Sequence, residues 1–178
     1  MTRQPWYSHI KWLYCFPNNI IIWIATLIIW SLYGHRLHWN DGLWCELKKD
    51  SWPSRTWYKG WGGTTLGHGG FYATGKTKGQ GVDTEIEFHE HIHIEQFEAG
   101  MLRVFLIAIF IMSVCLLASQ PMLGLYIALP LWFAGALITF VPNWLQALIR
   151  GEEAYMGSHH EESAYAQTEL KKRKGGFI

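Results

Sequence analysis

The chain has 178 residues, of which 49% are hydrophobic, and its formal net charge is only +1. This near-neutral balance predicts no nucleic-acid-binding surface, and the length leaves no room for a large separate soluble core. The three cysteines have no CxxC spacing and two of them lie in or next to apolar stretches, so we expect no disulfide framework: Cys15, Cys45 and Cys115.

The first 38 residues predict a membrane anchor. An aromatic-rich lead over residues 6–16 ends at Pro17-Asn18-Asn19, which we expect to break it, and a nearly all-apolar run over residues 20–33 follows. That run is shorter than the ~20 residues that cross a bilayer, so the lead or the residues up to Leu37 must extend it. An interfacial or signal-like segment is the alternative, but no convincing cleavage site follows, and we expect an uncleaved anchor over residues 1–38.

Residues 34–82 are polar and rich in tryptophan and glycine. Tryptophans at this density beside membrane segments indicate positions at the level of the lipid head groups. The glycine-rich piece over residues 63–72 predicts a short edge strand, and residues 73–81 predict a mobile loop.

A metal-binding motif, His89-Glu90-x-x-His93, lies inside residues 83–100. On a helix this spacing puts two imidazoles one turn apart on one face, which is a zinc-binding geometry. The glutamate beside them is then placed to take a proton from a zinc-bound water.

Residues 85–95 also alternate between apolar and polar, which is typical of a strand and would present His91 together with the other two histidines. We favour the helix because Asp83 and Thr84 resemble N-cap residues and glutamates follow in the first turn. The chain also continues into an apolar segment with no proline between. On a helix, His91 points away from the metal face.

Two long apolar runs, residues 101–119 and 122–141, follow the motif and are joined by Gln120-Pro121. Each is long enough to span a bilayer, so together they predict a helical hairpin, with Pro130 kinking its second leg. A hairpin returns the chain to the face it left, so the tail lies beside the histidine helix. That tail carries several acidic and histidine residues: Glu152, Glu153, His159, His160, Glu161 and Glu162. Two imidazoles and one tail carboxylate would form the His₂Glu arrangement of a catalytic zinc site.

The predicted fold is therefore mainly α and integral to the membrane. About three transmembrane helices are expected, with the motif helix running into the hairpin and a small Trp- and Gly-rich extramembrane region that contains a short strand. Residues 1–38 form the anchor, and residues 39–178 form a second domain with the hairpin over 101–149 and the ligand-bearing tail. We expect residues 40–95 and 152–178 on one membrane face, residues 1–12 on the other, and, from the distribution of Lys and Arg, the catalytic face in the cytoplasm.

The motif, with its continuation Gln96-Phe97-Glu98 and the preceding residues 63–68, resembles a group of small bacterial membrane proteins with a zinc-peptidase signature. In that group an apolar hairpin follows the HExxH helix, and an Asn-Pro-Phe-Glu-x-x-Ala-Tyr segment closes the domain. Residues 158–165 would be the closing segment here, with His159-His160 in place of Pro-Phe. Its Glu-x-x-Ala element is also similar to the third-ligand motif of gluzincins such as the membrane-embedded CAAX-protease-like enzymes, which usually have Asp where Tyr165 stands.

The resemblance implies a zinc metallopeptidase in which His89, His93 and Glu161 bind Zn²⁺ and Glu90 is the general base. Because Ser158-x-x-Glu161 is also a capping-box pattern, the third ligand could instead be a neighbouring residue: Glu162, Glu153 or His160. Gln96 could orient a ligand or the tail. Oxyanion support could come from four other side chains: His68, Tyr155, His159 and His160.

Two other classes of function stay open. The chain could be an accessory subunit of a larger membrane complex that keeps a structural or vestigial metal site. It could also be a membrane His-box oxidase, since His35-x-x-His38 adds a further histidine pair. The expected partners are the lipid bilayer and a membrane or peptide substrate.

Overall fold

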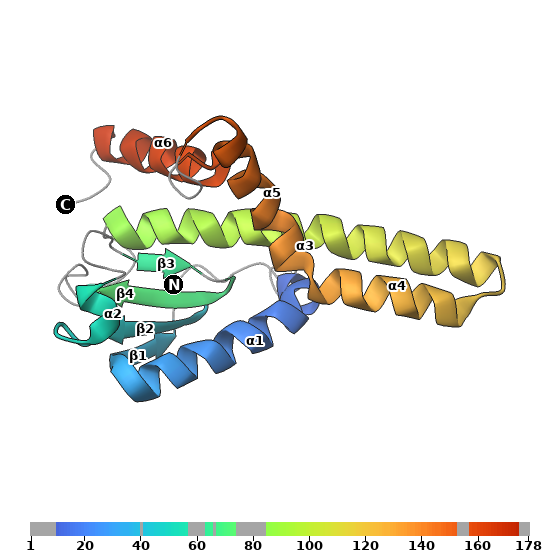
Figure 1. Cartoon of the computed structure of the whole chain (residues 1–178), viewed down its shortest axis with the longest axis horizontal. Helices are drawn as coiled ribbons and strands as arrows, with labels where there is room; N and C mark the ends of the chain where they lie inside the picture. Colours follow the sequence, from blue (N-terminus) through green and yellow to red (C-terminus); the bar gives the residue numbers. More distant parts are fainter. Residues whose placement is uncertain are drawn as a thin grey trace.

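The computed structural model describes residues 10–39, 41–56, 63–65, 67–73, 85–152 and 157–174. The described residues form six helices and four strands (Figure 1), which are α1 Ile10–Tyr33, β1 Gly34–Trp39, β2 Leu43–Leu47, α2 Trp52–Arg55, β3 Gly63–Thr65, β4 Gly69–Ala73, α3 Glu85–Leu117, α4 Pro121–Phe133, α5 Gly135–Ile149 and α6 His159–Arg173.

The four strands form one sheet in the order β1-β2-β4-β3. The pairs β1/β2 and β3/β4 are antiparallel and β2/β4 is parallel, so β3 is an edge strand. The sequence predicted a strand within residues 63–72 but missed the two strands between residues 34 and 47. Strand β2 buries Trp44, Cys45 and Leu47 on the two faces of the sheet, whereas β1 has no buried side chain and is held by its pairing with β2.

Helices α1 and α3 cover opposite faces of this sheet. On one face, Cys45, Leu47 and Phe71 pack with Ile29 and Tyr33 of α1. On the other face, two aromatic side chains of the sheet pack against α3: Trp44 and Tyr72 contact Ile94. The density of tryptophans in this part of the sequence predicted positions at the lipid head groups. Trp44 does not fit that prediction, because it is buried in the core between the sheet and α3.

Helix α1 runs without interruption through Pro17, Asn18 and Asn19, so the expected break there is wrong. Both asparagines are buried and find partners: Asn18 Nδ2 donates to the Trp132 carbonyl at 3.2 Å, and Asn19 Oδ1 lies 3.0 Å from a ring nitrogen of His68. These contacts help keep the segment helical although a proline inside a helix removes one backbone hydrogen bond. The aromatic lead extends the apolar run; residues 34–38 do not, because they belong to β1.

The expectation that residues 1–12 lie on the opposite membrane face from residues 40–95 does not fit the described part of the lead, because Lys11 pairs with Asp41. Lys11 Nζ lies 2.7 Å from an oxygen of Asp41, in the β1–β2 turn, and 2.9 Å from Glu98 of α3. The first turn of α1 therefore lies beside the turn and the motif helix. Helix α1 lies along the sheet.

Helix α3 contains 33 residues and confirms the helical interpretation of the motif. It continues through Gly100, where α5 passes so closely that a Cβ at this position would collide with the Thr139 side chain. The proposed N-cap residues Asp83 and Thr84 lie outside the described residues. The C-terminal half of α3 pairs with α4 in the predicted hairpin, which projects beyond the other elements (Figure 1).

The second leg of the hairpin is bent. Helices α4 and α5 meet at 58° around Ala134, four residues beyond the predicted kink at Pro130. The small residues there let the chain turn closely over α3, and Gly135 packs directly on Met101.

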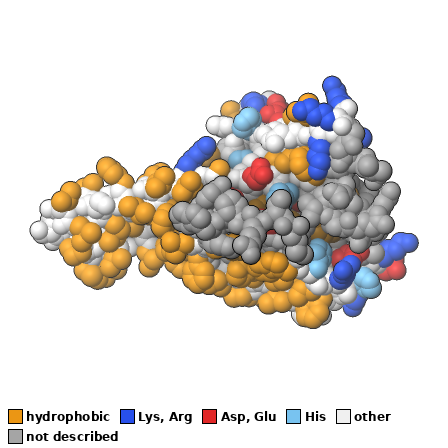
Figure 2. All heavy atoms as spheres, turned by 180° about the vertical axis from the view of Figure 1, so that it is seen from behind, with side chains coloured by type: hydrophobic (Ala, Val, Ile, Leu, Met, Phe, Trp, Pro, Cys, Tyr) orange, Lys and Arg blue, Asp and Glu red, His pale blue; other side chains and the backbone are white. Residues whose placement is uncertain are grey.

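Two helices, α1 and the part of α3 from Phe88 to Leu117, are long and apolar enough to cross a membrane, and the bent pair α4–α5 makes a third if it is one span. Hydrophobic side chains cover the projecting hairpin and continue along the molecule on the face seen in Figure 2. The α1 side chains that face away from the sheet are exposed and apolar, among them Leu13, Phe16, Ile24, Ile28 and Leu32.

Candidate metal site

The predicted ligands come together between α3 and α6. His89 Nε2 lies 3.2 Å from one carboxylate oxygen of Glu161, and His93 Nε2 lies 3.1 Å from the other. The two Nε2 atoms are 3.2 Å apart. Among the described residues, these three form the group of His, Cys, Asp and Glu side chains that could hold a metal ion.

These distances are compatible with a bound metal ion, for which a tetrahedral zinc site gives a standard of comparison. Ligand atoms 2.0–2.1 Å from a tetrahedral zinc lie about 3.3 Å from one another. The two Nε2 atoms are 3.2 Å apart, and each lies 3.1–3.2 Å from a different oxygen of the Glu161 carboxylate. One ligand atom from each of the three residues lies within 4.8 Å of the other two, which is close enough for the three side chains to share one metal ion. Three protein ligands also leave the fourth position open, as in catalytic sites.

Gln96 orients His93 and ties it to α6. Its Oε1 lies 2.9 Å from His93 Nδ1, and its Nε2 donates to the His160 carbonyl at 2.9 Å. Because the amide oxygen can only accept, His93 carries its proton on Nδ1 and leaves Nε2 free for a metal. The sequence suggested that Gln96 could orient a ligand or the tail, and the structure shows its contacts with His93 and with the first turn of α6.

Glu90 lies next to the pair but is held by the edge strand β3. It is 3% exposed, and its Oε2 accepts a hydrogen bond from the Thr65 hydroxyl at 2.6 Å. Gly63 lets the strand come this close, because a Cβ there would be 3.0 Å from Glu90 Oε1. Thr65 is a functional candidate that the sequence did not reveal, since nothing in the spacing of residues 65 and 90 links them.

The start of α6 aims Glu161 at the histidines. Ser158 is the N-cap, and its hydroxyl accepts from the Glu161 backbone N–H at 3.4 Å. Only this half of the capping box forms, because the Glu161 carboxylate is directed to the two imidazoles. Glu162 is exposed and Glu153 lies outside the described residues.

His160, another alternative third ligand, has a different partner. Its Nε2 lies 2.8 Å from Asn143 Nδ2 of α5, which fixes the first turn of α6 against α5. Burial lowers the pKa of His160, and the nearby imidazoles of His93 and His159 lower it further, while its hydrogen bond with the Thr139 carbonyl acts in the opposite direction.

Tyr165 closes the outer side of the site. Its ring lies 4.6 Å from the His89 ring, centroid to centroid. Burial raises the pKa of its hydroxyl, and the negative charges of Glu161 and Glu90 raise it further, so the phenol stays protonated at neutral pH. The sequence marked this position only as a departure from the gluzincin pattern.

A cavity of about 450 Å³ borders the candidate metal site. His93 and Glu161 lie at one end, and β3 contributes Thr64 and Thr65. The remaining wall is mostly apolar and comes largely from α1 and α5: Ile21, Ile22, Ala25, Ala136, Leu137, Phe140, Val141 and Trp144. This shape gives the polar site an apolar approach.

The other histidines are placed elsewhere. His91 is half-buried and does not belong to the cluster. His68 is fully buried and bonded to Glu98 at 2.8 Å and to Asn19, which makes it part of the packing of α1 on α3. His159 is exposed, and Tyr155 lies outside the described residues.

Comparisons with models of protein families, with curated proteins and with solved structures found no match.

Proposed function

We propose that this chain is a membrane-embedded, zinc-dependent metallopeptidase, with His89, His93 and Glu161 as ligands and Glu90 as general base. The observation that carries the proposal is the approach of two imidazoles from α3 and one carboxylate from α6 to within 3.1–3.2 Å of each other. Buried groups of this kind carry a large desolvation cost unless a cation or a proton compensates them. The apolar surfaces of α1 and the hairpin support the membrane location.

When bound, zinc would polarise a substrate carbonyl and acidify a water molecule. Glu90 would accept the proton of the attacking water and pass it to the leaving amine nitrogen. The Thr65 hydroxyl would hold the Glu90 carboxylate in one orientation during both transfers. Gln96 would keep the His93 ring aligned and its Nδ1 protonated.

The cavity of about 450 Å³ supports a peptide substrate with a large apolar side chain near the cleaved bond. Because α1 and α5 form its walls, such a substrate would reach the site from the bilayer side. Orientation of the site towards the cytoplasm remains part of the proposal.

A structural metal site in a non-catalytic membrane subunit is the second candidate. It is favoured by the fact that the three ligands join α3 to α6, so a metal there would also fix the C-terminal helix. A His-box oxidase is not supported, because the described residues offer no second group of ligands for another iron, and His35 and His38 lie on β1.

Substitution Glu90→Gln separates the first two functions. The full-length chain, purified in detergent and loaded with zinc, is incubated with a library of fluorogenic peptides containing apolar residues, and cleavage is read by mass spectrometry. We expect wild type to cleave, and Glu90→Gln to keep one zinc per chain and lose cleavage by a factor of about 10²–10⁴, the usual contribution of a general base. Equal cleavage by both proteins, or none by wild type with zinc bound, would contradict the peptidase and leave the structural site.

A further inference from the structure

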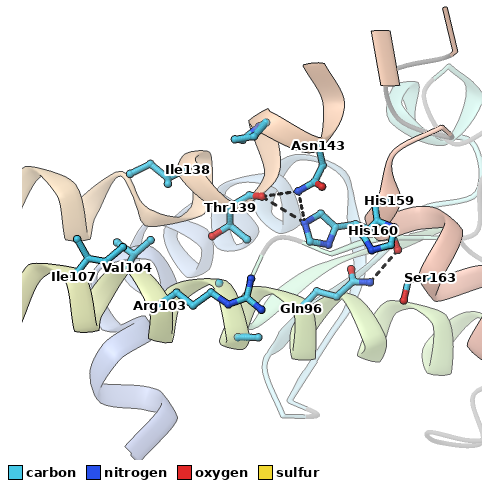
Figure 3. Close-up of a pocket in the computed structure, with 13 residues that line it drawn as sticks. Gln96, Arg103, Val104, Ile107, Ile138, Thr139, Asn143, His159, His160 and Ser163 are labelled. Atoms are coloured by element: carbon cyan, nitrogen blue, oxygen red, sulfur yellow. Dashed lines mark hydrogen bonds between the residues drawn. The ribbon is translucent and has the colours of Figure 1, made fainter. Parts of the chain in front are cut away.

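A second cavity, of about 490 Å³, lies between α3, α5 and α6 (Figure 3). It touches the first cavity only through His160, which lines both. Arg103 is the one Lys or Arg among its described lining residues, and no Asp or Glu is among them. In Figure 3 the Arg103 side chain extends along α3 in the direction of Gln96 and His160.

Arg103 is exposed, and the part of the chain that the structure describes provides no carboxylate partner for it. Neutral polar groups surround the same space: Asn143, Thr139 and Ser163. The first turn of α6 also borders the cavity, but Glu161 and Glu162 already lie in that turn, so the positive charge of the cavity comes from Arg103. The cavity thus has one cationic group, Arg103, and no Asp or Glu among its described lining residues, while the Thr139 hydroxyl and the Asn143 amide already donate hydrogen bonds within the protein.

The other wall is apolar. Val104 and Ile107 continue α3 into the hairpin, and Ile138 faces them from α5. Ile107 and Ile138 are exposed and belong to the apolar surface that extends along the projecting hairpin. A free phosphate ion or the terminus of a soluble peptide would contact only the cationic end of the cavity. An amphiphile would contact both the cationic end and the apolar wall.

We propose that this cavity binds an anionic phospholipid, with its phosphate on the Arg103 guanidinium and an acyl chain along Val104, Ile107 and Ile138. A guanidinium holds phosphate through two parallel hydrogen bonds, and an arginine at the start of an apolar helical segment lies at head-group depth. Since Gln96 and His160 line the cavity too, the bound lipid contacts the link between α6 and the metal-site helix. The inference rests on the membrane location proposed above and not on the metal chemistry.

The test is native mass spectrometry of the full-length chain released from nanodiscs made of equal parts phosphatidylglycerol and phosphatidylcholine. We expect wild type to retain one phosphatidylglycerol. Arg103→Gln should lower its affinity about tenfold, the effect of losing one charge-assisted contact. Arg36→Gln removes the same charge from the exposed strand β1 and should change nothing. Ser163→Trp, which fills the cavity from half-buried Ser163 on α6, should abolish retention altogether and serves as the test if Arg103→Gln does not fold.

Equal retention of the two lipids by wild type, or unchanged retention by Arg103→Gln, would overturn the proposal. Displacement of the lipid by equimolar inorganic phosphate, or by a peptide with a free C-terminal carboxylate, would overturn it as well. Zinc is measured in the same samples. Zinc binding without lipid selectivity refutes the lipid site alone, and lipid selectivity without zinc refutes the proposed metal function alone.

Discussion

Substitution Gln96→Leu tests how far the metal site depends on its supporting hydrogen bonds. Leucine keeps most of the side-chain volume but removes both contacts at 2.9 Å, one to His93 Nδ1 and one to the His160 carbonyl. Each such bond contributes about 1 kcal/mol net, so about 2 kcal/mol of the preorganisation of the site is lost. That loss corresponds to about 30-fold weaker zinc binding, within the 10–100-fold range typical of partners that orient metal ligands.

The assay is a zinc titration of the purified full-length chain against a competing fluorescent chelator. Gln167→Leu is the matched control, because Gln167 lies exposed on α6 and bonds only to Ser163. We expect the control to bind zinc as wild type does. An unchanged affinity in Gln96→Leu, or an equal loss in both variants, would refute the role of Gln96.

Three further outcomes are expected. His91→Ala should keep one zinc per chain, and His89→Ala should lose it, as measured by mass spectrometry of bound metal; equal loss would contradict the shared helical face. Thr65→Val should leave zinc in place and lower peptide cleavage about tenfold, because the Glu90 carboxylate loses its 2.6 Å donor; unchanged cleavage would speak against a positioning role. Burial raises the pKa of Cys45 to about 11, so at pH 8 only about one thiol in a thousand is ionised and maleimide should label it far more slowly than in the unfolded chain. Equal labelling rates would contradict the buried sheet.

The two histidines of the candidate site could be predicted because their spacing is local. The positions of His89 and His93 follow from helical geometry, and a hairpin that returns the chain explains why a tail carboxylate meets them. The choice of Glu161 over Glu162 could not be derived in this way. It depends on how the first turn of α6 is rotated, which the contact between His160 and Asn143 sets.

The sheet and the path of α1 were not predictable from pattern. Strand β1 pairs with β2 across a short turn, and β2 pairs with β4, which is distant in sequence. Helices α1 and α3 cover the two faces of this sheet. Local periodicity in the sequence does not reveal such contacts between distant segments. The break expected at Pro17 did not occur because distant residues supply partners for Asn18 and Asn19. Tertiary contacts overrode the local signal in each case.

Zinc K-edge X-ray absorption of the zinc-loaded full-length chain tests the central claim most directly. The account predicts nitrogen and oxygen neighbours at about 2.0–2.2 Å, the outer scattering of two imidazoles and no sulfur. The spectrum of Glu90→Gln should be the same, and that of Glu161→Ala should lose an oxygen neighbour. A spectrum with sulfur ligands, with one imidazole, or with a change in Glu90→Gln as large as in Glu161→Ala would contradict a site built from His89, His93 and Glu161.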